Sequence, residues 1–331
     1  MKFSLIIPVY NRPDEVADLL QSLDSQTDRD FEVILVEDGS TIPCKPQADQ
    51  YAGRFNVRYF FKSNEGRSIA RNYGMEQAEG DYFVFVDSDC ILPPDYFANL
   101  RRRLDQTNAD CFGGPDSAHE SFTPTQKAIN FAMTSFLTTG GIRGGKIQME
   151  KFVPRTFNMG FSREVWQKVG GFREMFSEDI DMSTRIRQAG FAPQLFRDVI
   201  VFHKRRGDLK KFWHQVHVFG MSRITLQLLY PGSMKLVHWM PAVFTLGSAL
   251  LIILALFLSP LWIIPLLIYI AALWLSALAA TRSLGIACRA VAASMVQLLG
   301  YGTGFLRAYI WKILLRHGRD EAQEIAMRKG K

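Results

Sequence analysis

The feature that most constrains this chain is a long apolar run without charges. Residues 236–281 contain no Asp, Glu, Lys or Arg, although these four residue types make up 21% of the sequence. A run of this length can cross a bilayer twice, because each crossing needs about 20 apolar residues. We therefore predict two transmembrane spans, over residues 236–258 and 261–280. The mixed sequence before them is typical of a domain that folds in water and is long enough to bury a core.

A third apolar segment follows, over residues 290–311. It is interrupted by Gly300, Gly302, Gly304 and Arg307. The segment is either a third span or an interfacial helix. We prefer two spans plus an interfacial segment, because two spans return the chain to its starting side and leave the basic tail there.

These segments divide the chain into three predicted parts. Residues 1–230 form a soluble domain, which ends in an amphipathic helix over residues 210–230 that suits a membrane surface. Residues 231–316 form the membrane region, and residues 317–331 form a basic cytoplasmic tail.

The charge pattern predicts the orientation. The net charge is +7, and basic residues gather on both sides of the apolar run, where the positive-inside rule places them in the cytoplasm. We therefore predict an integral protein of the cytoplasmic (inner) membrane that contacts membrane lipids, with its soluble domain in the cytoplasm. The four cysteines lack paired spacing, which suits a reducing compartment. No basic stripe interleaved with aromatic residues occurs in the soluble part, so we expect no nucleic-acid partner. The flanking basic residues are Lys204, Arg205, Arg206, Lys210, Lys211, Arg282, Arg289, Arg316, Arg319, Arg328 and Lys329.

The first part of the chain alternates apolar strands with helices. We predict strands over residues 3–9, 31–36, 57–61 and 82–86, and helices over residues 14–23, 68–77, 163–169 and 179–188. Such alternation indicates a mostly parallel sheet covered on both faces. Ligands then gather beyond the carboxyl ends of the strands, which is where the polar clusters fall. The middle section, residues 110–201, is less regular, and its glycines at positions 140, 141, 144 and 145 predict a mobile loop.

The strongest local signal is Asp87-Ser88-Asp89, directly after an apolar strand. Residues i and i+2 of a strand point the same way, and two adjacent carboxylates repel one another unless a cation lies between them. Oxygen ligands favour Mg²⁺ or Mn²⁺, which commonly also bind substrate phosphates. The alternative is a solvated turn, since Asp and Ser favour turns.

Two further clusters follow neighbouring strands. Glu37 and Asp38 could accept hydrogen bonds from a base or a ribose, or belong to an Asp-Gly turn. Asn64-Glu65-Gly66-Arg67 opens a helix, where backbone N–H groups, Arg67 and Arg71 suit a phosphate; the alternative is a capped surface helix. The absence of a Walker A loop and of GxGxxG disfavours a P-loop NTPase and a dinucleotide-binding dehydrogenase.

Acidic residues also open a later helix. Glu178, Asp179 and Asp181 lie in its first turn, where the helix dipole alone explains them, although one carboxylate could be a general base. His203 follows the apolar residues 199–202. It is a metal ligand, a phosphate contact or an ordinary core or surface histidine.

Taken in order, these motifs resemble the family 2 glycosyltransferases, which are inverting enzymes. The resemblance runs from residue 3 to about residue 203. It implies an α/β fold of the GT-A type (nucleotide-diphospho-sugar transferase), a Rossmann-like mixed sheet followed by C-terminal transmembrane helices. It is carried by Ile7-Pro8-Val9-Tyr10-Asn11-Arg12, Glu37-Asp38-Gly39-Ser40, Asn64, Gly66, Ala70-Arg71-Asn72-Tyr73-Gly74, Asp87-Ser88-Asp89, Asn158-Met159-Gly160-Phe161, Gly170-Gly171-Phe172 and Glu178-Asp179.

The resemblance implies site roles. Asp179 would be the catalytic base, and Asp89, with Asp87 and His203, would hold Mg²⁺ or Mn²⁺ at the diphosphate of a nucleotide sugar, for which we favour a UDP-sugar. Glu37 departs from the family pattern, which more often has Asp. The full set of substrate-binding candidates is Pro8, Tyr10, Arg12, Glu37, Asp38, Arg67, Arg71, Asp87, Ser88, Asn158 and Glu178.

Two alternatives exist for the substrate that accepts the sugar. The enzyme, a hexosyltransferase, would add a sugar to a lipid-linked saccharide in cell-surface polysaccharide or glycolipid biosynthesis, or would charge polyprenyl phosphate directly, as dolichol-phosphate-mannose-type synthases do. Those synthases usually have a Gln before the Pro pair, whereas Cys90-Ile91-Leu92 precedes Pro93-Pro94 here, so we prefer the first. A processive synthase is disfavoured because Gln-x-x-Arg-Trp is absent. A non-catalytic membrane scaffold is the alternative of another class.

Overall fold

The computed structural model describes the chain except for residues 118, 120–121, 141–151, 205–206 and 328–331. It divides into two compact units. The first comprises residues 1–119, 152–204 and 327–331, and the second residues 120–151 and 205–326. Of the glycine-rich stretch predicted to be a mobile loop, positions 141, 144 and 145 lie outside the described residues.

The first unit is built on a mixed seven-stranded sheet of order β3-β2-β1-β4-β8-β6-β9. Strands β1 to β4 run parallel, and β8 runs antiparallel to β4 and β6. A second sheet has the order β5-β10-β7. The strands are β1 (Phe3–Val9), β2 (Phe31–Asp38), β3 (Asn56–Lys62), β4 (Tyr82–Phe85), β5 (Cys90–Ile91), β6 (Cys111–Gly113), β7 (Asp116–Ser117), β8 (Met159–Ser162), β9 (Gln194–Leu195) and β10 (Val201–His203).

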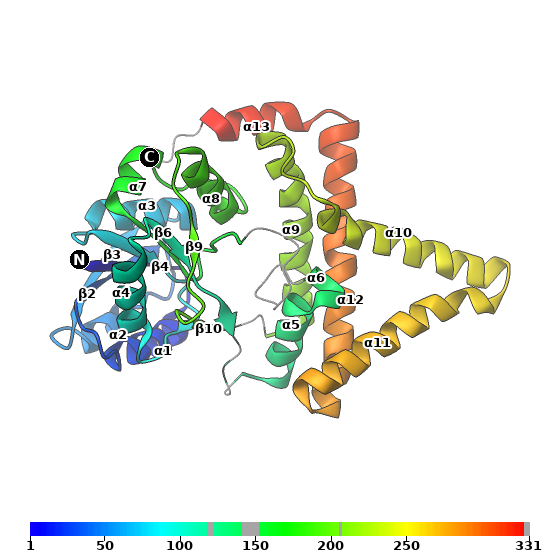
Figure 1. The fold of residues 1–331 in the computed structure, drawn as a ribbon, viewed down its shortest axis with the longest axis horizontal. Helices are drawn as coiled ribbons and strands as arrows, with labels where there is room; N and C mark the ends of the chain where they lie inside the picture. Colours follow the sequence, from blue (N-terminus) through cyan, green and yellow to red (C-terminus); the bar gives the residue numbers. More distant parts are fainter. Residues whose placement is uncertain (118, 120–121, 141–151, 205–206, 328–331) are drawn as a thin grey trace. The chain divides into compact units, whose positions relative to one another are not determined.

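Helices cover both faces of the large sheet (Figure 1). In β1, alternate side chains point to opposite faces: Leu5 packs with Leu19 of α1 and Phe97 of α4, whereas Ile6 packs with Ala70 of α3. Both faces are therefore buried, as expected for a largely parallel sheet. The helices of this unit are α1 (Pro13–Asp24), α2 (Lys45–Gln50), α3 (Arg67–Gln77), α4 (Tyr96–Thr107), α7 (Arg163–Val169) and α8 (Glu178–Gln188).

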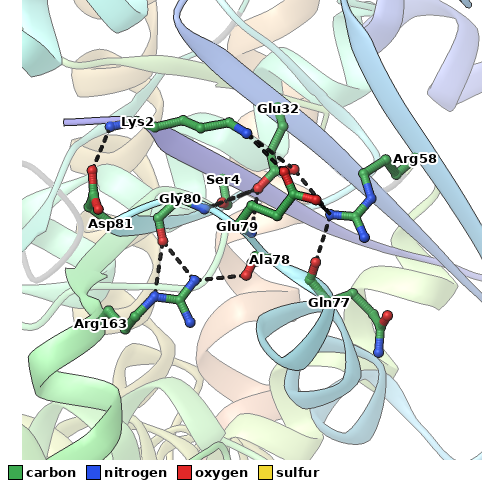
Figure 2. Close-up of polar contacts among 10 residues, drawn as sticks. All are labelled: Lys2, Ser4, Glu32, Arg58, Gln77, Ala78, Glu79, Gly80, Asp81 and Arg163. Atoms are coloured by element: carbon green, nitrogen blue, oxygen red, sulfur yellow. Dashed lines mark hydrogen bonds and ion pairs between the residues drawn. The ribbon is translucent and has the colours of Figure 1, made fainter.

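A polar network closes the amino-terminal edge of this sheet (Figure 2). Glu32 of β2 is fully buried and accepts hydrogen bonds from the Ser4 hydroxyl (2.7 Å), the Glu79 N–H (2.7 Å) and the Gly80 N–H (3.1 Å). Arg58 of β3 donates to the same carboxylate at 3.3 Å. The buried charge is thus satisfied by β1, β3 and the turn before β4, and the network fixes the edge opposite the polar clusters.

The second unit is helical. Helix α9 (Leu209–Leu229) packs along α12 (Leu284–Ala308). Glycine permits this close approach, because a Cβ on Gly220 would collide with the carbonyl oxygen of Tyr301, and one on Gly304 with that of His217. Helix α5 (Pro124–Thr134) packs on the same pair through Ile129. The other helices are α6 (Phe136–Thr139), α10 (Leu236–Phe257), η1 (Pro260–Ile263), α11 (Ile264–Thr281), η2 (Tyr309–Leu314) and α13 (Gly318–Met327).

Among the residues of this unit that the structure describes, three helical segments are long and apolar enough to cross a membrane: Leu236–Phe257, Pro260–Thr281 and Leu284–Leu314. The first two match the predicted spans closely. The third begins before the expected position 290, because Leu284 to Arg289 already form helix.

The units also divide the chain differently from the predicted boundary at residue 230. Helix α9 buries Phe212 and Val216 against α5 and α12, so it groups with the long apolar helices rather than with the sheet. The segment that carries α5 and α6 groups with them too.

Candidate active site

Several of the predicted site residues lie at the carboxyl-terminal edge of the large sheet. Strands β2, β1 and β4 are neighbours and parallel, so Asp38, Tyr10 and Asp87 leave the sheet at the same edge. Tyr10 is half exposed there, and Pro8 is partly buried within β1. Ser88 is buried between the two aspartates. The alternation of strands and helices thus positions the site.

The second sheet brings His203 to the aspartates. Strand β10 pairs with β5 so that His203 lies opposite Cys90. Nε2 of His203 is 3.1 Å from Oδ1 of Asp89 and 3.9 Å from Oδ2 of Asp87. Residues far apart in the sequence are therefore joined in one cluster of two carboxylates and an imidazole.

The chemistry of this cluster fits a divalent cation. Asp89, Cys90 and His203 each offer a ligand atom, and these atoms lie within 4.8 Å of one another. A thiol is a soft ligand, which suits Zn²⁺ or Cu⁺ better than Mn²⁺ or Mg²⁺. The two carboxylates and the imidazole remain as donors, a set suited to Mn²⁺ or Mg²⁺.

Arg12 also reaches this cluster. Its Nη1 donates to Oδ2 of Asp89 at 2.9 Å and lies 3.4 Å from Glu15. The structure therefore places this predicted substrate contact beside the predicted metal ligand.

A buried arginine connects the two aspartates to the acidic start of α8. Arg71 donates to Asp87 at 2.8 Å and to Glu178 at 2.9 Å, and both Arg71 and Glu178 are almost fully buried. Arg67 reaches the other oxygen of Glu178 at 2.8 Å from a half-exposed position. Arg67 and Arg71 were predicted to bind phosphate, and the contacts described here pair both of them with carboxylates.

Asp179 lies in the first turn of α8, beside Glu178. Its Oδ1 accepts the Ile180 N–H at 2.8 Å, and Nη1 of Arg155 lies 3.4 Å from its Oδ2. The carboxylate keeps some exposure. A partly exposed carboxylate can accept a proton from a bound hydroxyl.

Glu37 and Asp38 shape the site through internal hydrogen bonds. Glu37 is fully buried and accepts from the Cys44 N–H at 2.7 Å and the Ser40 hydroxyl. Asp38 accepts from the Gly66 N–H at 2.8 Å and from Lys62 at 2.9 Å. Asp38 thereby fixes the loop that opens α3.

Asn158 occupies the core. Its side chain is fully buried, accepts from the Tyr96 hydroxyl at 2.8 Å and donates to the Val199 carbonyl at 2.8 Å. It ties β8 to α4 and to the segment before β10. Its contact with a substrate stays a prediction.

Two residues of this region were absent from the sequence-based set. Arg155 contacts Asp179, and Asp116 contacts His203. Neither lies in a recognisable motif. The local signal for Asp116 is its position shortly after β6, which ends at Gly113 and is followed by Gly114-Pro115.

Comparisons with known proteins agree with this architecture. Residues 4–170 match the model of the family described as Glycosyl transferase family 2. The uncharacterized glycosyltransferase YibD of Escherichia coli (strain K12) is 32% identical over 169 residues, which are 51% of this chain and 46% of YibD. The match thus spans less than half the length of that relative.

Two solved structures have a similar fold. Mannosyltransferase PcManGT from Pyrobaculum calidifontis, in complex with GDP-Man and Mn²⁺, has a TM-score of 0.56 at 18% identity and covers 96% of this chain and 88% of its own. TarS 1–349 of S. aureus, in complex with UDP-GlcNAc, has a TM-score of 0.50 at 19% identity and covers 92% and 91%. These similarities show the GT-A fold.

Proposed function

The chain belongs to Glycosyl transferase family 2, and on this premise we propose that it transfers a sugar from a nucleotide sugar, with inversion, to a hydroxyl of a lipid-linked saccharide. The observation that carries the proposal is the continuous polar path from the metal cluster to the start of α8. Asp87, which Ser88 separates from Asp89 in the sequence, bonds Arg71, and Arg71 bonds Glu178, the neighbour of Asp179. One buried guanidinium thus connects a predicted donor-site residue, Asp87, to the residue beside the predicted base.

The donor side rests on Asp89, Asp87 and His203. These residues would hold Mn²⁺ or Mg²⁺, and the imidazole favours Mn²⁺, because Mg²⁺ prefers oxygen ligands. When bound, the cation would supply positive charge to the diphosphate that leaves. PcManGT was solved with GDP-Man and Mn²⁺ and TarS with UDP-GlcNAc, so both nucleotides are reasonable donors; we favour a UDP-sugar.

The acceptor side rests on Asp179. One of its carboxylate oxygens would take the proton of the acceptor hydroxyl, whose oxygen attacks the anomeric carbon from the face opposite the departing diphosphate. The single displacement inverts the configuration. Arg155, 3.4 Å from Oδ2, and the Ile180 N–H at Oδ1 orient the carboxylate for this step.

The membrane helices support a lipid-linked acceptor. Three segments are able to cross a bilayer, and an anchored enzyme meets lipid-linked substrates by lateral diffusion. The basic flanks support a cytoplasmic catalytic domain on the inner membrane, where sugar nucleotides are available. Direct transfer to polyprenyl phosphate is the second candidate.

The test is transfer by the full chain in detergent, with UDP- and GDP-sugars, Mn²⁺ and extracted membrane lipids. Asp179→Asn should retain sugar-nucleotide binding in calorimetry but lose transfer by at least about 100-fold, the scale of a general base. Asp49→Asn, an exposed carboxylate that pairs with Lys45, is the matched control and should remain active.

Substantial turnover by Asp179→Asn would remove Asp179 from the base role. Full activity in EDTA would remove the cation from the mechanism. If the wild type releases no nucleoside diphosphate from any common donor, with or without acceptor lipids, the scaffold alternative is favoured.

A further inference from the structure

The ring of His203 is held from three sides. Its Nε2 faces Asp89 at 3.1 Å, and its Nδ1 lies 3.7 Å from Oδ2 of Asp116. Phe157 stacks on its face, with ring centroids 5.1 Å apart and planes 29° apart. These contacts define both the plane of the ring and which nitrogen faces the metal cluster.

Asp116 is placed for this contact by the second sheet. It lies in β7, which pairs with β10 so that Asp116 is opposite Val201 and Ser117 is opposite Phe202. Only 3% of its side chain is exposed. A buried aspartate beside a histidine that faces a metal cluster is placed to orient that histidine.

We propose that Asp116 is a positioning residue: its carboxylate receives the Nδ1–H of His203 and thereby leaves the lone pair of Nε2 for the divalent cation. The inference rests on the proposed function, which makes His203 a metal ligand. Histidines that bind metals commonly donate their other N–H to a carboxylate, which fixes the tautomer and orients the ring.

The geometry of the imidazole shows that Asp116 would not itself bind the cation. The two ring nitrogens point in diverging directions, so a carboxylate at Nδ1 does not share a cation bound at Nε2. The separation of 3.7 Å is longer than a hydrogen bond, and a movement of less than about 1 Å closes it. Asp116 therefore acts on the cation through the imidazole.

The first experiment titrates the full chain in detergent with Mn²⁺ alone and measures free Mn²⁺ by electron paramagnetic resonance. Asp116→Ala should raise the Kd for Mn²⁺ about 10–100-fold, the scale for an outer-sphere partner of a metal-binding histidine. Asp116→Asn keeps the shape of the side chain and should give a smaller rise. Asp198→Asn is the control: this aspartate pairs with Arg102 and Arg103 in the same unit, and the substitution removes the same charge.

The second experiment is a double-mutant cycle with His203→Ala, with the Mn²⁺ titration extended to millimolar concentrations. Because Asp116 acts through the imidazole, Asp116→Asn should cause no further loss when His203 is already absent. The thermal midpoint without Mn²⁺ is measured for every variant to show that each is folded.

An unchanged Kd in both folded Asp116 variants would overturn the inference and leave the proposed function intact. An additional loss in the His203→Ala background would overturn it too, because Asp116 would then act directly or by charge alone. Absence of Mn²⁺ binding to the wild type would instead overturn the metal site itself, and with it this inference.

Discussion

Arg67 and Arg71 leave the same helix and reach the same carboxylate, yet they differ in burial. Both donate to Glu178, but Arg71 is 1% exposed and also holds Asp87, whereas Arg67 is 54% exposed. Removing one partner from a buried pair leaves a buried charge without compensation and typically costs about 3–5 kcal/mol. An exposed pair contributes at most about 1 kcal/mol.

We therefore expect Arg71→Gln to lower the free energy of unfolding by about 3 kcal/mol or more, and Arg67→Gln by less than about 1 kcal/mol. Urea titration of both variants in detergent measures the difference. If Arg71 instead served only as a phosphate ligand, Arg71→Gln would weaken nucleotide binding with little change in stability. Equal stability of the two variants would contradict the bridging role.

The contacts of Arg71 also show what the sequence could and could not predict about single residues. Short motifs predicted that Asp87, Asp89, Asp179 and His203 matter, and the structure brings Asp87, Asp89 and His203 within contact distance. The motifs did not predict that Arg71 joins Asp87 to Glu178, which is 107 residues away from it. Such pairing depends on which strand ends become neighbours, and local spacing does not contain that information.

At the scale of elements, periodicity predicted the long elements well. The strand expected over residues 3–9 and the helix expected over 163–169 have those bounds in the structure. The strand expected to end at residue 36 continues to Asp38, because internal hydrogen bonds allow Glu37 and Asp38 to be buried. Strands β5, β7 and β10 were not predicted, since two or three residues show no periodicity.

The network around Glu32 gives a prediction for the first sheet (Figure 2). Glu32 and Glu79 share Arg58 and Lys2 as partners, but the Glu32 side chain is fully buried and that of Glu79 is 61% exposed. Glu32→Gln should lower the free energy of unfolding by about 2 kcal/mol, the cost of a mismatched buried polar group. The control Glu79→Gln should change it by less than about 1 kcal/mol.

The loss of stability in Glu32→Gln, relative to Glu79→Gln, should depend on pH. Burial, the largest influence, acts to raise the pKa of Glu32, but hydrogen bonds from Ser4 and Glu79 and the charge of Lys2 together hold it below its ordinary value of 4.5. A lowered folded-state pKa contributes stability above the unfolded-state pKa, which is lost as the pH falls through the folded-state value. The deficit of Glu32→Gln should therefore shrink when thermal midpoints are measured from pH 7 downward to below 4.5. A deficit that stays constant with pH would contradict this account.

At the scale of the whole molecule, the compact units of the structure divide the chain differently from the division at residue 230 that the sequence predicts. Residues 122–139 lie between sheet elements in the sequence, yet Ile129 and Met133 pack with Phe212 of α9. The amino-acid composition of a helix does not indicate which unit the helix packs against. The predicted boundary at residue 230 followed the rise in hydropathy, whereas the structure groups α9 with the helices that it contacts.

The remaining question at this scale is whether the third apolar segment crosses the membrane. Its most apolar window is 39% buried within the protein, against 17% and 11% for the first two segments, so protein as well as lipid can cover it. If it crosses, the basic residues after it lie on the side opposite to the basic residues before the first span, against the positive-inside rule. The rule therefore favours two spans.

Cysteine labelling tests this directly. Cys288, near the start of α12, is exposed, whereas Cys44, Cys90 and Cys111 are buried. With the catalytic domain in the cytoplasm, as proposed, two spans return the chain to that side. A membrane-impermeant maleimide should then leave Cys288 unlabelled in intact cells, and permeabilisation should allow labelling. In a Cys288→Ser background, which is the unlabelled control, Gln323→Cys adds a thiol at an exposed position of α13. Two spans predict that this thiol is protected in intact cells as well. Labelling of position 323 from outside would show that α12 crosses the bilayer, and labelling of Cys288 from outside would reverse the orientation of the whole chain.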